Sequence, residues 1–568
     1  MERRVLLAIS LSFLVLFGYQ SFFPPPEPAP TGATPAATAT AQPGQTASAP
    51  AAAQAGAVGQ APAAAPATPV APAVRADTEE REFVIETSSV RAVFTNRGAR
   101  LKHWELKQYR ELSGAPVDLV PADTGGQPLP FSLLLDASTD TAAVNNGLFV
   151  AESNAPARID ATTSPAALTF AYESADGLTV RKRFTLQPSG FDVVFMAEVT
   201  RGGAKLNPRI VWGPGLGEEI ARTAGSGGFF SGNYTYPAAG FVYLNGSVER
   251  FAGAAASSAG VQQGAFRYAG VTDHYFVAAT VEAPGNQRVE FAHVPYTPAG
   301  AGQVTRQFVA FTVGFDQPPG DVRFFVGPKQ FEALSAVSPE FTKVIDFGMF
   351  AFLAVPLRGA LEWVHGFVGN YGWSIIVLTL LINLVMAPLR HKSVVSMRKM
   401  QELQPQLKAI QDRYSHLKMT DPARGKMNEE VMALYKSKGA NPASGCLPML
   451  LTLPVLFAFY SLLSQAIEMR GAPFAGWITD LSQRDSWYIT PLLMGATMFW
   501  QQRLQPGTGD PVQQKVLMFM PVMFTAMFLP APSGLVIYWF VSNLWAIGQQ
   551  YFTNWMIGPP KAVAGVKR

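Results

Sequence analysis

Apolar and polar residues alternate along much of the chain between residues 79 and 328. The alternation is clearest on either side of the turn-forming sequence Gln187-Pro188-Ser189-Gly190. The apolar positions are Leu178, Val180, Phe184 and Leu186 before the turn and Phe191, Val193, Phe195, Ala197 and Val199 after it; Val309, Phe311, Val313 and Phe315 repeat the pattern. Because successive side chains of a strand point to opposite faces, the pattern predicts an all-β antiparallel sandwich over residues 79–328.

Long apolar runs replace this alternation in the last third of the chain. They cover Tyr371–Leu389, Leu447–Leu463, Tyr488–Trp500, Val516–Pro530 and Leu535–Tyr551. A sixth run, Val5–Phe23, follows the basic start of the chain and is close to the roughly 20 residues that cross a bilayer. It fits either a cleaved signal peptide or an uncleaved anchor. No small-x-small cleavage sequence follows it, so we expect an anchor over residues 1–23 and a polytopic α-helical membrane protein with six transmembrane helices.

Two further segments connect these regions. Residues 24–78 are almost entirely Ala, Pro, Thr, Gly and Gln, which cannot bury enough apolar surface to fold, so we predict a disordered tether. Residues 329–366 mix large apolar residues with Arg358, Glu362 and His365, as an amphipathic interfacial helix does. A core helix of the preceding domain is the alternative. We assign residues 367–555 to a helical membrane core and residues 556–568 to a basic tail.

Composition and charge indicate a membrane protein and predict its orientation in the bilayer. Charged residues make up 15% of the chain, against about 25% in soluble domains. The net charge of +4 is small and dispersed, so we expect no specific DNA binding. Residues 390–441 contain eleven basic residues and residues 466–486 contain two. Because loops rich in Lys and Arg stay in the cytoplasm, we predict an inner-membrane protein with cytoplasmic termini and a periplasmic β-domain.

The apolar runs carry isolated uncharged polar residues and almost no charge. Thr379 and Asn383 are four residues apart and therefore share one helix face. The others are Thr452, Thr497, Thr525 and Asn543. Such residues either form hydrogen bonds between helices or line a wet groove that receives polar parts of another protein, and their spacing leaves both possibilities open.

The runs at residues 488–500 and 516–530 are short. At 1.5 Å per residue they cover roughly 20–23 Å of a hydrocarbon core about 30 Å thick, which predicts a thinned bilayer beside them if they span it. The second run is rich in methionine and phenylalanine, namely Met518, Phe519, Met520, Met523, Phe524, Met527 and Phe528. Methionine-rich surfaces adapt to varied partners, although a well-packed helix explains the composition equally well.

The basic loop 390–441 divides into two amphipathic stretches, Ser393–Tyr414 and Met427–Lys438, separated by Met419-Thr420-Asp421-Pro422. This division predicts a helical hairpin. With eleven basic and five acidic residues, its net charge of +6 suits acidic lipids or ribosomal RNA. A solvated hairpin without a partner is the simpler interpretation.

Several local sequences together resemble the YidC/Oxa/Alb insertase family, in its Gram-negative form with a large periplasmic domain. They are Asn441-Pro442-Ala443-Ser444-Gly445-Cys446-Leu447-Pro448, Ala472-Pro473-Phe474, Trp477-Ile478, Asp480-Leu481, Gln513-Gln514-Lys515, Met520-Pro521, Pro532-Ser533-Gly534-Leu535, Tyr538, Ser542-Asn543, and Phe325-Val326-Gly327-Pro328-Lys329. The resemblance covers the chain from the first apolar run to the last, except the tether.

The resemblance implies a membrane protein insertase and chaperone with a five-helix core and a β-supersandwich. Its clients would be nascent membrane proteins, handled alone or with the Sec translocon and translating ribosomes. Implied residues are Thr379, Asn383, Thr452 and Tyr538 in a hydrophilic groove, and Leu453, Phe457, Met523 and Met527 on a hydrophobic slide that contacts the client. We expect Arg398, Lys399, Lys408 and Arg413 of the hairpin to contact the ribosome or lipid.

One residue departs from the family pattern. The family commonly has an arginine in the second span, and Asn383 stands at that position. An amide can form hydrogen bonds with a client, but it cannot attract acidic residues, so electrostatic attraction at this position is in doubt.

The sequence fits two other function classes less well. A transporter would need ion ligands inside the membrane or repeated halves, and neither is visible. A periplasmic glycan enzyme would need paired carboxylates in a cleft, which the sequence leaves open. His103, His274 and His293 are isolated, so we expect no metal site, cofactor, catalytic residue or small-molecule substrate.

Overall fold

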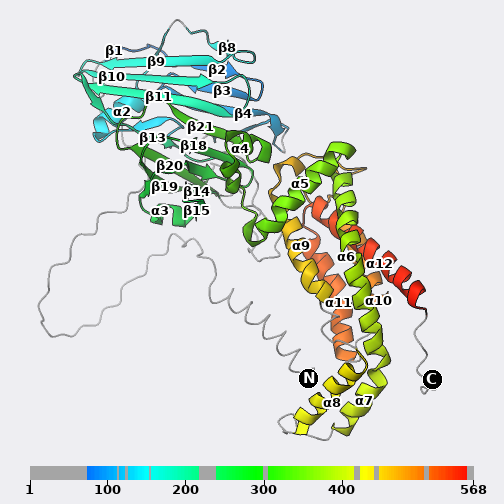
Figure 1. Ribbon diagram of the computed structural model, residues 1–568. Coiled ribbons are helices and arrows are strands. Elements are labelled where there is room, and N and C mark those ends of the chain that lie inside the picture. Colours follow the sequence, from blue (N-terminus) through cyan, green and yellow to red (C-terminus); the bar gives the residue numbers. More distant parts are fainter. Residues whose placement is uncertain are drawn as a thin grey trace, which may run out of the picture. The chain divides into compact units, whose positions relative to one another are not determined.

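The structure is a computed structural model that describes residues 73–111, 114–121, 126–152, 155–216, 238–297, 305–414, 423–439, 447–504 and 511–558. Within these ranges a β-domain is followed by a set of helices (Figure 1). The predicted anchor, nearly all of the predicted tether and most of the basic tail lie outside the described residues. The first strand begins at Ala73, six residues before the predicted start of the β-domain.

The β-domain contains one large and two small sheets. The large sheet has eleven strands. In spatial order they are β1 (Ala73–Arg75), β9 (Ala166–Ser174), β10 (Leu178–Leu186), β11 (Asp192–Arg201), β21 (Val322–Pro328), β18 (Phe276–Val281), β17 (Tyr268–Thr272), β14 (Ala239–Leu244) and β15 (Ser247–Ala252), with β7 (Val150–Ala151) beside β9 and β12 (Ala204–Leu206) beside β11.

Each small sheet has five strands. One runs β16 (Gln262–Gly264), β19 (Gln287–Tyr296), β20 (Arg306–Phe315), β13 (Arg209–Trp212) and β6 (Ser132–Leu134). The other runs β5 (Pro116–Asp118), β4 (Arg100–Arg110), β3 (Val90–Thr95), β2 (Glu82–Glu86) and β8 (Arg158–Asp160). Two short helices, α2 (Ser138–Asn146) and α3 (Ala254–Ser258), complete the domain.

The hairpin of β10 and β11 has the form that the alternating pattern predicts. Leu178 pairs with Arg201 and Leu186 with Val193, so the apolar positions of both strands share one buried face. Phe184 lies opposite Phe195, with ring centroids 5.1 Å apart. Gly190 closes the turn with a φ of +90°, which favours glycine because it has no Cβ. The prediction of a β-sandwich is confirmed.

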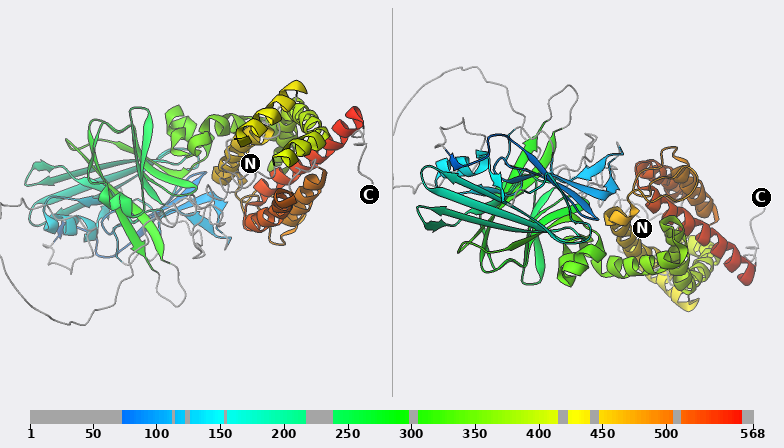
Figure 2. Two further views of the ribbon diagram at one scale, coloured as in Figure 1. Left: turned by 90° about the horizontal axis from the view of Figure 1, so that it is seen from below. Right: turned by 90° about the horizontal axis from the view of Figure 1, so that it is seen from above.

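Helices follow the β-domain. They are α4 (Phe331–Val337), α5 (Ala351–Val368), α6 (Tyr371–Glu402), α7 (Gln404–Arg413), α8 (Ala423–Ser437), α9 (Leu447–Gln465), α10 (Ile489–Leu504), α11 (Pro511–Phe528) and α12 (Ser533–Ile557), with 3₁₀ turns η2 (Pro339–Val344), η3 (Gly348–Phe350) and η5 (Ile467–Met469). Figure 2 shows α6, α9, α10 and α12 gathered in one bundle, in which α6 and α10 both pack against α12.

Helix α5 is amphipathic and occupies the second half of the segment 329–366 that was predicted to be one helix, whereas the first half forms α4, η2 and η3. Its exposed side chains include Phe352, Trp363 and Phe367, at 63–76% exposure, whereas Arg358 and Leu361 on the other face are buried. Gly369 ends the helix with a φ of +70°, and its N–H donates to the carbonyl of His365. This left-handed cap separates α5 from α6.

Helix α6 differs from the prediction. We expected a span ending at Leu389 and a separate hairpin helix beginning at Ser393, but a single helix runs without a break over 32 residues. The apolar run ends where charged residues begin, yet lysine and arginine are good helix formers, so hydrophobicity ends there and helicity does not. The hairpin of α7 and α8 therefore continues directly from α6.

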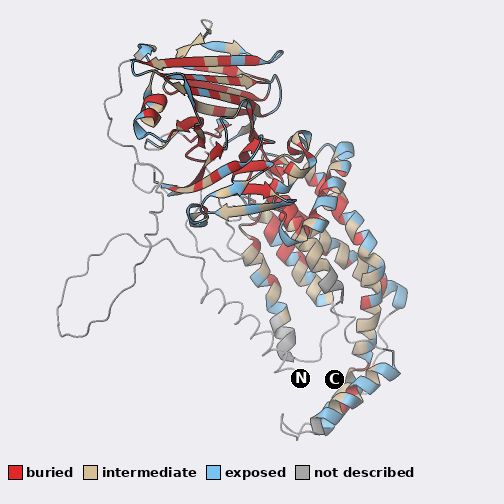
Figure 3. Cartoon of the chain, turned by 60° about the vertical axis from the view of Figure 1, so that its left-hand side comes forward, coloured by how far each residue is buried: buried red, intermediate tan, exposed pale blue. Residues whose placement is uncertain are grey.

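The six-helix count remains a prediction. Among the described residues, Tyr371–Met400 is the one helical stretch long and apolar enough to cross a bilayer by length and composition. Shorter apolar helices occupy Pro454–Gln465 and Leu517–Phe528. In Figure 3 the strands are mostly buried, whereas many helical residues are half-buried or exposed. Large apolar side chains that are exposed on these helices are typical of a surface that faces lipid.

Candidate functional site

Polar side chains collect where α6 packs against α12, and we call the set Thr379, Asn383, Tyr538 and Ser542 the polar seam. Thr379 and Asn383 are buried, and the hydroxyl of Thr379 donates to the carbonyl of Ile375 at 2.6 Å. The Asn383 side-chain amide donates to the carbonyl of Thr379 at 2.8 Å and to the hydroxyl of Ser542 at 3.4 Å. Its Oδ1 atom is buried and accepts no hydrogen bond among the described residues.

Tyr538 completes the polar seam from α12. Its ring is 4% exposed and stacks on Phe459 of α9, with centroids 4.4 Å apart. The structure thus brings together three of the four residues expected in a groove. The fourth, Thr452 on α9, is half-buried.

The other polar residues of the spans form direct contacts between helices. The Asn543 amide donates to the hydroxyl of Thr497 at 3.3 Å, which joins α12 to α10. Thr525 of α11 lies so close to Gly495 of α10 that a Cβ at Gly495 would be 2.0 Å from its hydroxyl oxygen. These contacts agree with the interpretation that polar residues of the spans join neighbouring helices. The unpaired acceptor of Asn383 agrees instead with a wet groove.

Helix α11 presents an apolar face to the surroundings. Met518, Phe519, Val522 and Met523 are 42–65% exposed. Its opposite face packs on Trp539 of α12 through Phe524 and Phe528, at centroid distances of 5.6 and 4.8 Å.

The residues predicted for the slide are therefore in different environments. Met523 is exposed, whereas Met527 is half-buried against the core. Phe457 of α9 stacks on Phe350, with centroids 5.5 Å apart. The side chain of Leu453 lies outside the described residues.

The basic residues predicted for the hairpin also differ in their surroundings. Lys399 and Lys408 are exposed. Arg413 of α7 pairs with Glu430 of α8 at 2.9 Å, which joins the two helices of the hairpin. Arg398 donates to the carbonyl of Gly558 at 2.7 Å and to Asn554, so it caps the carboxyl end of α12. An arginine there satisfies terminal carbonyls, which sequence reasoning did not reveal.

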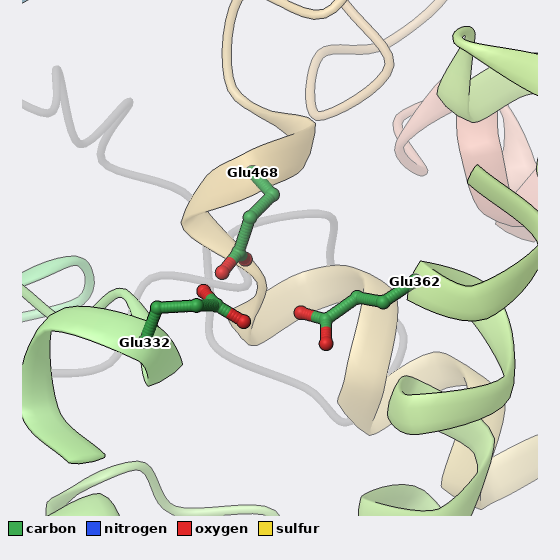
Figure 4. Close-up of side chains that lie close together, drawn as sticks. All are labelled: Glu332, Glu362 and Glu468. Carbon is green, nitrogen blue, oxygen red and sulfur yellow. The ribbon is translucent and has the colours of Figure 1, made fainter. Parts of the chain in front are cut away.

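An acidic cluster was also missed. Glu332 of α4, Glu362 of α5 and Glu468 of η5 bring carboxylate oxygens within 4.8 Å of one another (Figure 4). Arg358 pairs with both Glu332 and Glu362, and its guanidinium lies 3.9 Å from the centroid of the Phe331 ring. The positive charge of Arg358 thus offsets part of the repulsion among the three neighbouring carboxylates.

A cavity of about 500 Å³ in the β-domain is lined by Ala265, Phe266, Arg267, Glu282, Ala283, Gly285 and Asn286. Its one lining carboxylate, Glu282, is paired with Arg267 at 3.0 Å. Glycoside hydrolysis usually requires two carboxylates across the substrate, so this cavity does not favour the glycan-enzyme alternative.

Comparisons with known proteins point to one family. A family model described as YidC periplasmic domain matches residues 82–359, and one described as 60Kd inner membrane protein matches residues 363–559. The chain is 34% identical to a membrane protein insertase YidC of Geobacter metallireducens, covering 99% of this chain and 100% of that protein. It is also 34% identical to one of Syntrophus aciditrophicus, covering 98% and 99%. A crystal structure of an active YidC insertase is 16% identical with a TM-score of 0.35, covering 85% of this chain and 95% of that chain.

Proposed function

Because this chain belongs to the YidC family of membrane protein insertases, we propose that it receives polar client segments at the polar seam and apolar client segments on the exposed face of α11. The observation that carries the proposal is the unpaired, buried Oδ1 of Asn383. A buried polar atom without a partner costs about 1–3 kcal/mol, so water or a client donor at this position would be stabilising.

The exposed face of α11 supports the apolar half of the proposal. Met518, Phe519, Val522 and Met523 form a flexible, polarizable surface that fits apolar segments of different shape. Leu453, Phe457 and Met527 complete the proposed slide.

Short helices support a thinned membrane beside the slide. Helices α10 and α11 have 16 and 18 residues, which corresponds to about 24 and 27 Å against a hydrocarbon core of about 30 Å. Thinning of the bilayer lowers the barrier to moving a polar segment across it.

Photo-crosslinking tests the slide. A photoreactive residue at Met523 should capture an arrested nascent membrane protein much more strongly than one at Leu492, which is similarly exposed on α10. A probe at Asn245 of the β-domain should capture least. Equal capture at Met523 and Leu492 would show that the contact is non-specific and that the slide is misassigned.

We further propose that both termini are cytoplasmic and that the β-domain is periplasmic. The exposed Lys399 and Lys408 of the hairpin would contact acidic lipid or a translating ribosome. The Sec translocon would be a partner for some clients. The charge difference between the loops supports this orientation.

Labelling in intact membranes tests the orientation. In a Cys446→Ala background, a cysteine replacing Lys408 should react with an impermeant maleimide only from the cytoplasmic side, and one replacing Asn245 only from the periplasmic side. Reaction of both from the same side would contradict the topology.

A further inference from the structure

Residues 470–488, which connect η5 to α10, form a folded surface that the proposed function does not use. The carbonyl of Gln483 accepts hydrogen bonds from the N–H and the hydroxyl of Ser533, both at 2.8 Å, at the start of α12. The carbonyl of Pro473 accepts one from the side-chain amide of Asn370 at 2.9 Å, just before α6. The connection is therefore held at the end of the bundle where α6, α10 and α12 begin.

Two tryptophans of this connection are stacked on each other, and we call them the tryptophan platform. The rings of Trp477 and Trp487 are parallel to within 2°, and their centroids are 5.9 Å apart. Trp487 is 66% exposed and Trp477 is 38% exposed, so the rest of the protein covers the pair only in part. Exposed apolar side chains that lie together in one patch mark an interaction surface.

Asp485 holds the platform in place. Its side chain is buried, and one carboxylate oxygen accepts from the indole N–H of Trp477 at 3.0 Å and from the backbone N–H of Trp487 at 2.9 Å. The other oxygen accepts from the N–H and the hydroxyl of Thr490, both at 2.8 Å, in the first turn of α10. The platform is thus joined to the start of α10, and the polar N–H of Trp477 is satisfied by the protein.

The position of the platform indicates what it contacts. Helix α10 begins two residues after Trp487, and its Leu492 and Leu493 are exposed, so the platform continues into the apolar surface of that helix. Trp373 in the first turn of α6 is also exposed and packs on Phe474 of the connection, with centroids 5.4 Å apart. Tryptophan concentrates at membrane–water interfaces because its ring is apolar and its N–H is polar.

Arg484 adds a positive charge to the connection, three residues before Trp487. It is exposed, and its guanidinium donates to the hydroxyl of Tyr488 at 3.0 Å and lies 5.7 Å from the centroid of that ring. It pairs with no carboxylate among the residues that the structure describes, so most of its five N–H donors are available to a phosphate. Indole rings and a free guanidinium together match the headgroup layer of a phospholipid bilayer.

We propose that Trp477, Trp487 and Arg484 bind the phospholipid headgroup layer on the side of the membrane where α6, α10 and α12 begin. The indole rings lie at the boundary between the headgroups and the acyl chains, and the guanidinium binds a lipid phosphate. Asp485 is the positioning residue, because it joins the platform to α10 and so fixes the depth at which that helix enters the bilayer. The inference rests on the proposed function only in assigning this side to the periplasmic leaflet.

The test uses the full-length protein in vesicles of phosphatidylethanolamine and phosphatidylglycerol. In a Cys446→Ala background, Ser486→Cys carries an environment-sensitive fluorophore at an exposed position beside Trp487. A spin label on the lipid headgroup should quench this fluorophore about threefold more than a spin label near the middle of the acyl chain, because interfacial groups lie at headgroup level. The same fluorophore on Asn245→Cys of the β-domain should be quenched by neither.

Substitutions then identify the residues that make the contact. Trp487→Leu should lower the quenching by the headgroup label about twofold, because leucine has no preference for the interface. Arg484→Gln should lower it less, and by an amount that shrinks as salt is added. Trp555→Leu is the matched control, since Trp555 is 79% exposed near the opposite end of α12 and its loss should leave the quenching unchanged.

Four results would overturn the inference. Stronger quenching by the mid-chain label would place the connection in the hydrocarbon core, and quenching by neither label would place it in water. Equal quenching in the parent and in Trp487→Leu would show that the platform does not make the contact. Capture of an arrested client by a photoreactive residue at Ser486 as strongly as at Met523 would assign the platform to clients. The proposed function is tested separately, because the Met523 crosslink and the role of Asn383 do not depend on this contact.

Discussion

Replacing Asn383 with leucine is expected to slow insertion of clients with polar segments roughly five- to tenfold and to leave the melting temperature of the protein unchanged or raised. A hydrogen bond contributes about 1–1.5 kcal/mol, and 1.4 kcal/mol corresponds to a factor of ten. The protein itself loses little, because the Asn383 Oδ1 atom has no partner in the described structure and the bond from its amide to Ser542 is long, at 3.4 Å.

Asn543 provides the matched control. It is equally buried, but its amide bonds to Thr497 and to the carbonyl of Met494. Asn543→Leu should therefore lower stability by about 0.6 kcal/mol, the usual contribution of an interhelical hydrogen bond, without changing insertion per folded molecule. Both quantities are measured on the same preparations, by thermal unfolding and by single-turnover insertion. A stability loss in Asn383→Leu with normal insertion would reverse the roles assigned to these two residues.

Replacing Arg358 with glutamine is expected to destabilise the protein by about 2 kcal/mol. Removing one partner of a buried ion pair costs about 3–5 kcal/mol, and the value is reduced here because Glu332 is 55% exposed and Glu362 is 31% exposed. Without the guanidinium, three carboxylates face one another. Arg358→Gln combined with Glu362→Gln should recover part of the loss, and thermal unfolding of the four proteins gives the coupling energy.

The effect should depend on pH. Burial raises the pKa of Glu468, so its ionised form is less favourable in the folded protein than in the unfolded chain. The folded state then binds more protons, and stability falls as the pH rises from the ordinary glutamate value of 4.5 through the raised pKa. Arg358→Gln should steepen that fall, so its stability deficit should be smaller at pH 5 than at pH 8. A deficit that is the same at both values would exclude carboxylate repulsion as its cause.

Local patterns predicted the β-domain well because strand periodicity and turns are both determined by residues that lie close together in the sequence. The turn at Gly190 fixes which residues of β10 and β11 face each other, so the pairing of Phe184 with Phe195 follows from the spacing. The first strand, β1, was assigned to the tether because three residues carry too little pattern to be recognised. Its structure depends on pairing with β9, which is a hundred residues away.

The candidate site shows the same limit. Spacing alone placed Thr379 and Asn383 on one helix face, and the structure confirms that they share it. The partner of Asn383 on α12 is 159 residues away, and no local pattern identifies Ser542 as that partner. Arg390 was counted among the charges of the cytoplasmic loop because apolarity ends there. In the structure Arg390 lies within the unbroken helix α6.

The unbroken course of α6 gives the molecule a mechanical property. A helix of 32 residues is a rod about 48 Å long, and its last 20 residues, from Asn383 to Glu402, span about 28 Å. The carbonyl of Ala387 and the side chains of His391 and Arg398 contact α12 along this stretch, so a load applied to the hairpin of α7 and α8 is shared between α6 and α12 instead of bending α6 at Asn383.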